Sequence, residues 1–160
     1  MPNYHFSLYV RSLLEKAGWH PGRVAEPPVY FDHTLNYPRA IQAVLREFGG
    51  LEVRGHRDIT FDPGGADEDD VASYWVPLLG RPLYPIGFTD EYWSISMDGH
   101  GAMYLTGGYL SLLGMSFAEA MEEYFNYRLG TGLNQEDMTW GPEHRVINWP
   151  ELPDNPANQT

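Results

Sequence analysis

The sequence predicts an α+β fold, in which helices pack against a mainly antiparallel, twisted sheet. Helix-period apolar patterns occur near both ends of the 160-residue chain, and short apolar runs separated by glycine-rich turns lie between them. Strands that follow one another in sequence through tight turns pair antiparallel. A chain of this length suits one domain.

The N-terminal part is expected to contribute two helices. The first should run from about Asn3 to Ala17, and the second should begin near Tyr37, with Pro38 in a tolerated first-turn position. Apolar residues recur at helical spacing in both segments, and glycines follow each as stop signals. A short extended run, Val29–Phe31, is expected between them.

The middle of the chain is expected to form short strands around one helical turn. The expected strands are Leu51–Val53, Ile59–Phe61, Leu83–Ile86, Tyr92–Met97 and Ala102–Leu105. Trp75 and Leu78 lie at helical spacing ahead of the third strand, although Pro77 should interrupt a long helix there.

The stretch DGHG, at residues 98–101, is predicted to be the turn of a hairpin. Asp-Gly between two apolar runs is a strong hairpin signal, and Gly99 should supply the positive φ of the turn. Gly101 can form the bulge that accompanies a longer loop.

The last helix should begin after Ser116, because Ser116 and Glu119 have the spacing of a capping box, and it should end near Arg128. No regular period follows. We therefore expect a domain over residues 1–130 and an irregular C-terminal extension, partly packed on the domain, over residues 131–160.

The Asp98 and His100 pair does not have the pattern of a metal or phosphate site. No two of the six histidines are close enough for a familiar ligand spacing, and His100 stands where a calcium loop needs Asp or Asn. The glycines of this stretch lead into a strand instead of a helix, and the only lysine of the chain is Lys16. We expect no metal and no cofactor.

Other catalytic arrangements are also missing from the sequence. There is no cysteine and no G-x-S-x-G motif, and the paired carboxylates are adjacent residues of a kind common on solvated surfaces. The expectation is therefore that the chain is not an enzyme. A hydrolase would instead require a pocket containing several of Asp98, His100, Asp90 and Glu91.

The net charge indicates the kind of partner. Ten Lys and Arg residues against 22 Asp and Glu residues give −12. Direct nucleic-acid binding is disfavoured because it depends on cationic side chains, whereas a basic protein partner would be attracted. Solubility alone is the alternative explanation of this charge. The N-terminus has no signal-peptide pattern and no run could span a bilayer, so a cytoplasmic protein with no membrane contact is expected.

Two acidic stretches are candidates for partner contact, and the second includes aromatic residues of the type that dominate interface energetics. One of the two adjacent aromatic side chains should face inward, because side chains alternate along a strand. The candidate residues are Asp67, Glu68, Asp69, Asp70, Asp90, Glu91, Tyr92 and Trp93.

Five phrases in this order resemble the SUKH superfamily, most closely its third immunity-protein subgroup. They are LLEKAGWHPGR (Leu13–Arg23), AIQAVLREFGGLEV (Ala40–Val53), YPIGF (Tyr84–Phe88), SISMDGHGAMYL (Ser94–Leu105) and LGMSFAEAMEEYF (Leu113–Phe125). The resemblance implies an α+β fold without an active site. It also implies that the protein neutralises a polymorphic toxin, often a nuclease or another nucleic-acid-modifying enzyme, by binding it in the producing cell.

The superfamily also includes regulatory proteins, so the resemblance leaves open a binding scaffold for an endogenous partner. Its motif residues carry over as structural positions, and Arg23 is expected to be held by a carboxylate or by backbone carbonyls. The matching positions are Gly18, Trp19, Gly22, Arg23, Gly49, Gly50, Pro85, Gly87, Asp98 and Gly99. The resemblance implies neither the partner-contacting residues nor the oligomeric state.

Overall fold

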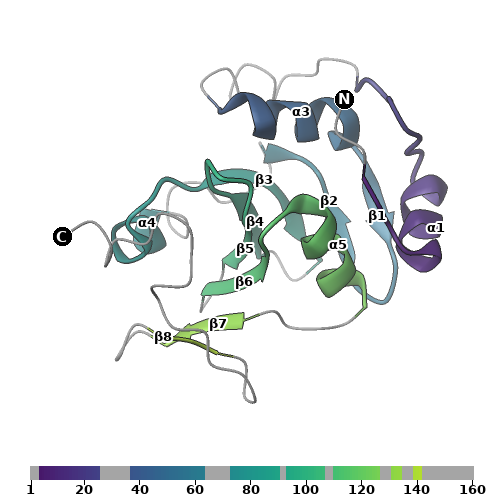
Figure 1. The fold of residues 1–160 in the computed structure, drawn as a ribbon. Helices are drawn as coiled ribbons and strands as arrows, with labels where there is room; N and C mark the ends of the chain where they lie inside the picture. The colour runs from purple at the N-terminus through teal and green to yellow at the C-terminus, as the bar shows by residue number, and fades with distance from the viewer. Residues whose placement is uncertain are drawn as a thin grey trace.

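The computed structural model describes residues 4–25, 37–63, 73–90, 93–106, 110–126, 131–134 and 139–141. Its core is one eight-stranded sheet in which the spatial order of the strands equals their order in sequence (Figure 1). Every neighbouring pair is antiparallel. The α+β class with a mainly antiparallel sheet is therefore confirmed.

The strands are short, as the sequence predicted, but more numerous. They are β1 (Glu52–Arg54), β2 (Asp58–Thr60), β3 (Tyr84–Thr89), β4 (Ser94–Met97), β5 (Met103–Thr106), β6 (Leu110–Gly114), β7 (Thr131–Asn134) and β8 (Thr139–Gly141). β7 and β8 lie in the segment that was expected to be irregular, so that expectation is wrong for these residues. β7 pairs with β6, which extends the sheet into this segment.

The described helices are α1 (Leu8–Lys16), α3 (Arg39–Phe48), α4 (Ser73–Leu79) and α5 (Phe117–Phe125). α1 begins later than expected, because the Ser7 side chain caps it by accepting a hydrogen bond from the Val10 amide. Pro77 lies inside α4, which is only seven residues long. Because proline has no backbone N–H, the helix lacks one hydrogen bond at this position.

The predicted capping box of α5 is confirmed in its first half. Ser116 Oγ accepts from the Glu119 amide at 3.2 Å, while Glu119 Oε2 accepts from the amide of Met115, one residue before the cap. α5 ends at Phe125, short of the expected end near Arg128, and residues 127–130 lie outside the described residues. The expected run Val29–Phe31 also lies outside them.

One face of the sheet packs against α1, α3 and α5 to form the main hydrophobic core. Phe48 of α3 lies at its centre, with ring centroids 5.8 Å from Trp19 and 4.5 Å from Phe117. α4 lies at the opposite end of the molecule from α1 (Figure 1), and its Trp75 and Leu79 are buried outside that core.

Both faces of the central strands are buried. Ile95 and Leu105 are opposite one another and belong to the main core, whereas the next pair, Ser96 and Tyr104, points to the other face and is also fully buried. Strand β5, which reads MYLT, accordingly has no clean alternation of apolar and polar residues, whereas β4 buries the serines of its alternating sequence SISM.

Candidate functional site

The DGHG stretch forms the loop between β4 and β5. The Asp98 amide donates to Ala102 O at 2.9 Å and the Gly101 amide to Asp98 O at 3.1 Å, which closes a three-residue loop. Gly101 carries the positive φ, at 94°, and Gly99 does not. The hairpin prediction is confirmed, but its assignment of the positive φ to Gly99 is wrong.

The Asp98 side chain also connects the turn to other parts of the structure. It is fully buried, and its Oδ1 accepts hydrogen bonds from the amides of His100 and Ala102 at 2.9 and 3.1 Å. Its Oδ2 accepts from Arg81 Nη1 at 3.0 Å and from the Tyr104 hydroxyl at 2.8 Å. The carboxylate therefore joins the loop, strand β5 and the segment before β3.

This buried cluster also affects the Tyr104 phenol. Burial raises the pKa of Tyr104 above its usual value, and the negative Asp98 carboxylate adds to the rise because it disfavours a second negative charge. Tyr104 therefore stays a neutral hydrogen-bond donor, which is the form that the contact with Asp98 requires.

The described residues that a hydrolase would need do not share one environment. Asp98 is buried in its ion pair, whereas His100 is exposed on the loop and Asp90 is exposed after β3. Glu91 lies outside the described residues. Within the described ranges, no group of three or more His, Asp or Glu residues is placed to hold a metal ion.

The expected partner-contacting residues are described only in part. The acidic run Asp67–Asp70 lies outside the described residues, as do Glu91 and Tyr92. Asp90 is exposed at the turn between β3 and β4. Trp93 is half-buried and packs against the main core, so this aromatic residue of the pair faces inward.

The motif residues lie mainly at turns. Gly18, Gly22 and Gly50 have positive φ, whereas Gly49 caps α3 with a φ of −55°. Arg23 Nη1 donates to two backbone carbonyls, Glu47 O at 2.7 Å and Gly49 O at 3.0 Å.

The remaining motif residues belong to the core and the sheet. Trp19 is buried beside Phe48. Pro85 O accepts from the Tyr37 hydroxyl at 2.9 Å. Gly87 lies where a Cβ atom would clash with the Thr60 carbonyl of β2.

An open hollow of about 490 Å³ lies between α1, the turn that joins β1 and β2, and the end of α5. Among the described residues it is lined by Tyr9, His56, Phe125 and Asn126. The centroids of the Tyr9 and His56 rings are 6.2 Å apart and the ring planes are tilted by 36°, so two of the walls are adjacent. This hollow is a candidate binding feature of the described surface.

Hydrogen bonds to Glu122 hold the helical walls of the hollow in place. The Ser7 amide, just before α1, donates to Glu122 Oε1 at 2.6 Å. Asn126 Nδ2 donates to Glu122 O at 2.7 Å and to its Oε2 at 3.2 Å. One carboxylate on α5 thus fixes both the start of α1 and a residue that lines the hollow.

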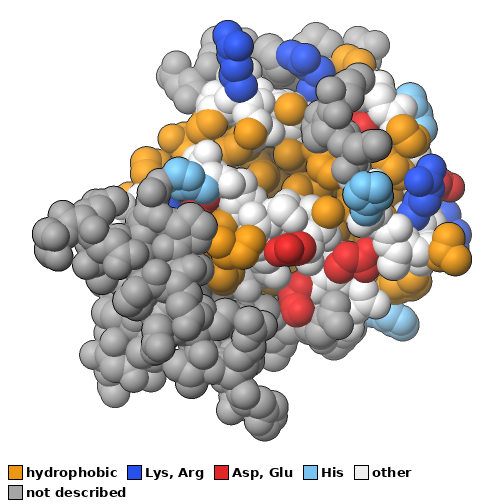
Figure 2. All heavy atoms as spheres, in the orientation of Figure 1, with side chains coloured by type: hydrophobic (Ala, Val, Ile, Leu, Met, Phe, Trp, Pro, Cys, Tyr) orange, Lys and Arg blue, Asp and Glu red, His pale blue; other side chains and the backbone are white. Residues whose placement is uncertain are grey.

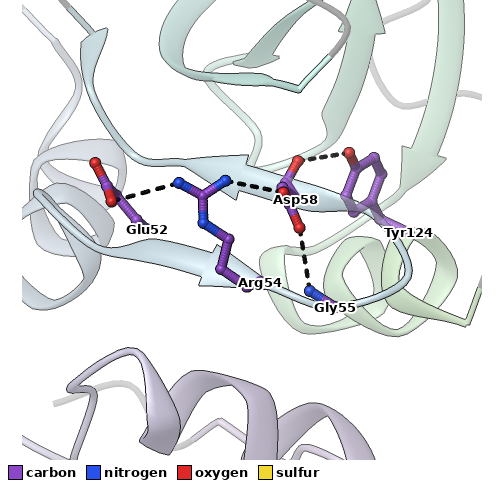
Figure 3. Close-up of polar contacts among 5 residues, drawn as sticks. All are labelled: Glu52, Arg54, Gly55, Asp58 and Tyr124. Carbon is purple, nitrogen blue, oxygen red and sulfur yellow. Dashed lines mark hydrogen bonds and ion pairs between the residues drawn. The ribbon is translucent and has the colours of Figure 1, made fainter.

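Polar contacts also hold the β1–β2 turn (Figure 3). Arg54 lies between Glu52, at 3.6 Å, and Asp58, at 2.9 Å, and Asp58 Oδ1 accepts from the Gly55 amide at 3.2 Å. The Tyr124 hydroxyl donates to Asp58 O at 2.8 Å, and the Arg57 guanidinium lies 4.1 Å from the centre of the Tyr124 ring. The turn that carries His56 is therefore anchored to α5.

Sequence reasoning did not find the hollow or Arg81. The available signal was that Leu8 and Tyr9 are large apolar residues outside the helical period of Val10, Leu13, Leu14 and Ala17. His56 and Arg81 had no local signal, because each acquires its neighbours only when segments distant in sequence pack together.

The described geometry is that of an α+β scaffold with an exposed concave surface. The model of the SUKH-3 immunity protein family matches residues 6–127, which is well over half of the chain, and the chain belongs to this family. Neither the curated proteins nor the solved structures compared with the chain gave a match. Among the described helices, none has both the length and the apolar character that crossing a membrane requires.

Proposed function

We propose that this protein binds and neutralises a cognate polymorphic toxin in the cytoplasm of the cell that makes both. The toxin would be a nuclease or another enzyme that modifies nucleic acids, and inhibition would occur by protein–protein contact, without catalysis or a cofactor. The family match over residues 6–127 carries this proposal.

The charge of the chain supports the nature of the partner. Enzymes that act on nucleic acids bind phosphates through Lys and Arg, so their active surfaces are basic. A protein with a net charge of −12 is attracted to such a surface, and the attraction accelerates association at low ionic strength. An interface of the usual size would bury about 1,200–2,000 Å² in total.

Co-expression with the toxin encoded by the adjacent gene tests the proposal. The toxin's catalytic domain should kill a bacterial host when expressed alone, and co-expression of this protein should restore growth and yield a stable complex on purification. A toxin of the same class from another system is the matched control and should remain lethal. Killing by the adjacent toxin, with the protein folded and no complex formed, would contradict the proposal and favour an endogenous partner.

A further inference from the structure

The surface around the hollow exposes apolar side chains that the fold itself does not bury. Leu8 is 88% exposed and Tyr9 38% exposed, and they are adjacent in the first turn of α1. Of the four large hydrophobic residues that are exposed among the described residues, these two are the only ones adjacent in sequence, and Tyr9 lines the hollow. A single exposed apolar residue is common on protein surfaces, whereas neighbouring exposed apolar residues are typical of interaction sites.

The hollow is suited to receive a side chain because its walls are already fixed. Glu122 fixes the start of α1 and Asn126, and the Tyr124 hydroxyl holds the β1–β2 turn. Walls that are ordered before binding lower the entropy lost on association. Tyr9 and His56 contribute ring surfaces, which pack well against an apolar or aromatic side chain.

The acidic residues of α5, beside the hollow, indicate which residues the partner carries around the side chain that enters the hollow. The solvent-facing side of α5 carries Glu119, Glu122 and Glu123, and Figure 2 shows acidic side chains gathered over this helix. The Glu119 and Glu122 carboxylates accept hydrogen bonds from backbone amides. Arg54, at the end of β1, is paired with Asp58.

We propose that the hollow and its rim, namely Leu8, Tyr9, His56 and the acidic side of α5, form the surface that docks the toxin. The occupant is an apolar or aromatic side chain of the toxin's catalytic domain, flanked by Lys or Arg residues that face α5. This inference rests on the proposed function and adds to it the location of the interface.

The test compares two substitutions that place a charge on an equally accessible apolar residue. Leu8→Asp changes the exposed residue of α1 that precedes Tyr9, which lines the hollow. Val24→Asp is the matched control, because Val24 is 67% exposed in a different segment, beside the C-terminal end of α3, where the Ala25 amide donates to Arg46 O. Circular dichroism and thermal melting should show that both variants remain folded, because neither side chain is part of the core.

Titration calorimetry with the toxin's catalytic domain, inactivated by mutation, gives the Kd of each protein. We expect Leu8→Asp to weaken binding by roughly tenfold or more, and Val24→Asp to bind like the unmodified chain. His56→Ala should also weaken binding, since it removes a wall of the hollow.

Three other results would overturn the inference, each in a different way. If the unmodified chain binds and Leu8→Asp and His56→Ala bind equally well, the interface lies elsewhere and the proposed function stands. If the unmodified chain does not bind, the proposed function fails and the docking surface fails with it. If light scattering shows a dimer that only Leu8→Asp and His56→Ala disrupt, the occupant of the hollow is a second copy of this chain.

Discussion

The ion pair between Asp98 and Arg81 makes a quantitative prediction about stability. Asp98→Ala removes a carboxylate that is fully buried and accepts four hydrogen bonds, two of them from Arg81 and Tyr104. Arg81 is only 6% exposed, so water cannot readily take the place of the carboxylate. The substitution should therefore destabilise the fold strongly, although Asp98 lies in a hairpin loop.

The size of the effect follows from the contacts that are lost. Removing one partner of a buried ion pair costs about 3–5 kcal/mol. A buried hydroxyl that loses its acceptor, here that of Tyr104, costs about 1–3 kcal/mol more. The two losses share one carboxylate and do not add fully, so we expect a loss of about 4 kcal/mol. At about 2–4 °C per kcal/mol for a chain of this size, Tm should fall by roughly 8–16 °C.

Urea unfolding and thermal melting at neutral pH measure this loss. Asp90→Ala is the control, because Asp90 is an exposed aspartate in a turn and should change stability by less than about 0.5 kcal/mol. In a double-mutant cycle with Arg81→Met, the coupling energy should be about 1–3 kcal/mol. A loss below about 1 kcal/mol for Asp98→Ala, or no coupling to Arg81, would refute the reasoning.

Three further predictions concern packing, pH and association. Gly87→Ala should destabilise the fold by about 1–3 kcal/mol in urea unfolding, because its Cβ would clash with the backbone of β2. Gly99→Ala is the control and should be nearly neutral, since Gly99 has open space around it and no positive φ. Equal effects of the two substitutions would contradict the close approach of Gly87 to β2. The pKa of Tyr104 is raised above its unfolded value of about 10, so its stabilising contribution is present below pH 10 and is lost as the pH rises further. Tyr104→Phe should therefore lose less Tm than the unmodified chain between about pH 9 and about pH 11, and parallel losses would refute this. Replacing Asp67–Asp70 with Asn and Gln should slow association with a basic toxin, most at low salt, because it reduces the attraction at long range. An unchanged on-rate in surface plasmon resonance would show that this acidic run does not steer the toxin.

Local patterns in the sequence were sufficient for much of the fold. Ile41, Val44, Leu45 and Phe48 form the buried face of α3 at the spacing expected for a helix. Ser116 caps α5, and the Asp98 loop closes a hairpin. Each of these depends on residues within about seven positions of one another, which is the range over which sequence patterns are informative.

The rest of the fold depends on contacts that no local pattern encodes. β6 is apolar and buried on both faces, so its sequence, LSLLG, lacks the alternation that marks a strand. Asp98 was predicted as a turn residue, but its ion partner, Arg81, is 17 positions away. The hollow combines Tyr9, His56 and Phe125, which only tertiary packing brings together.

The chain-order arrangement of the sheet has a consequence for the folding pathway. Each strand pairs with its sequence neighbour, so most of the sheet can form through short-range hairpins with small loop-closure entropies. The contact between Ser7 and Glu122 instead joins residues 115 positions apart. We therefore expect α1 to dock late, and the surface around Tyr9 to be completed only when the chain has folded almost entirely. A kinetic folding intermediate would then have a formed sheet and an incomplete hollow.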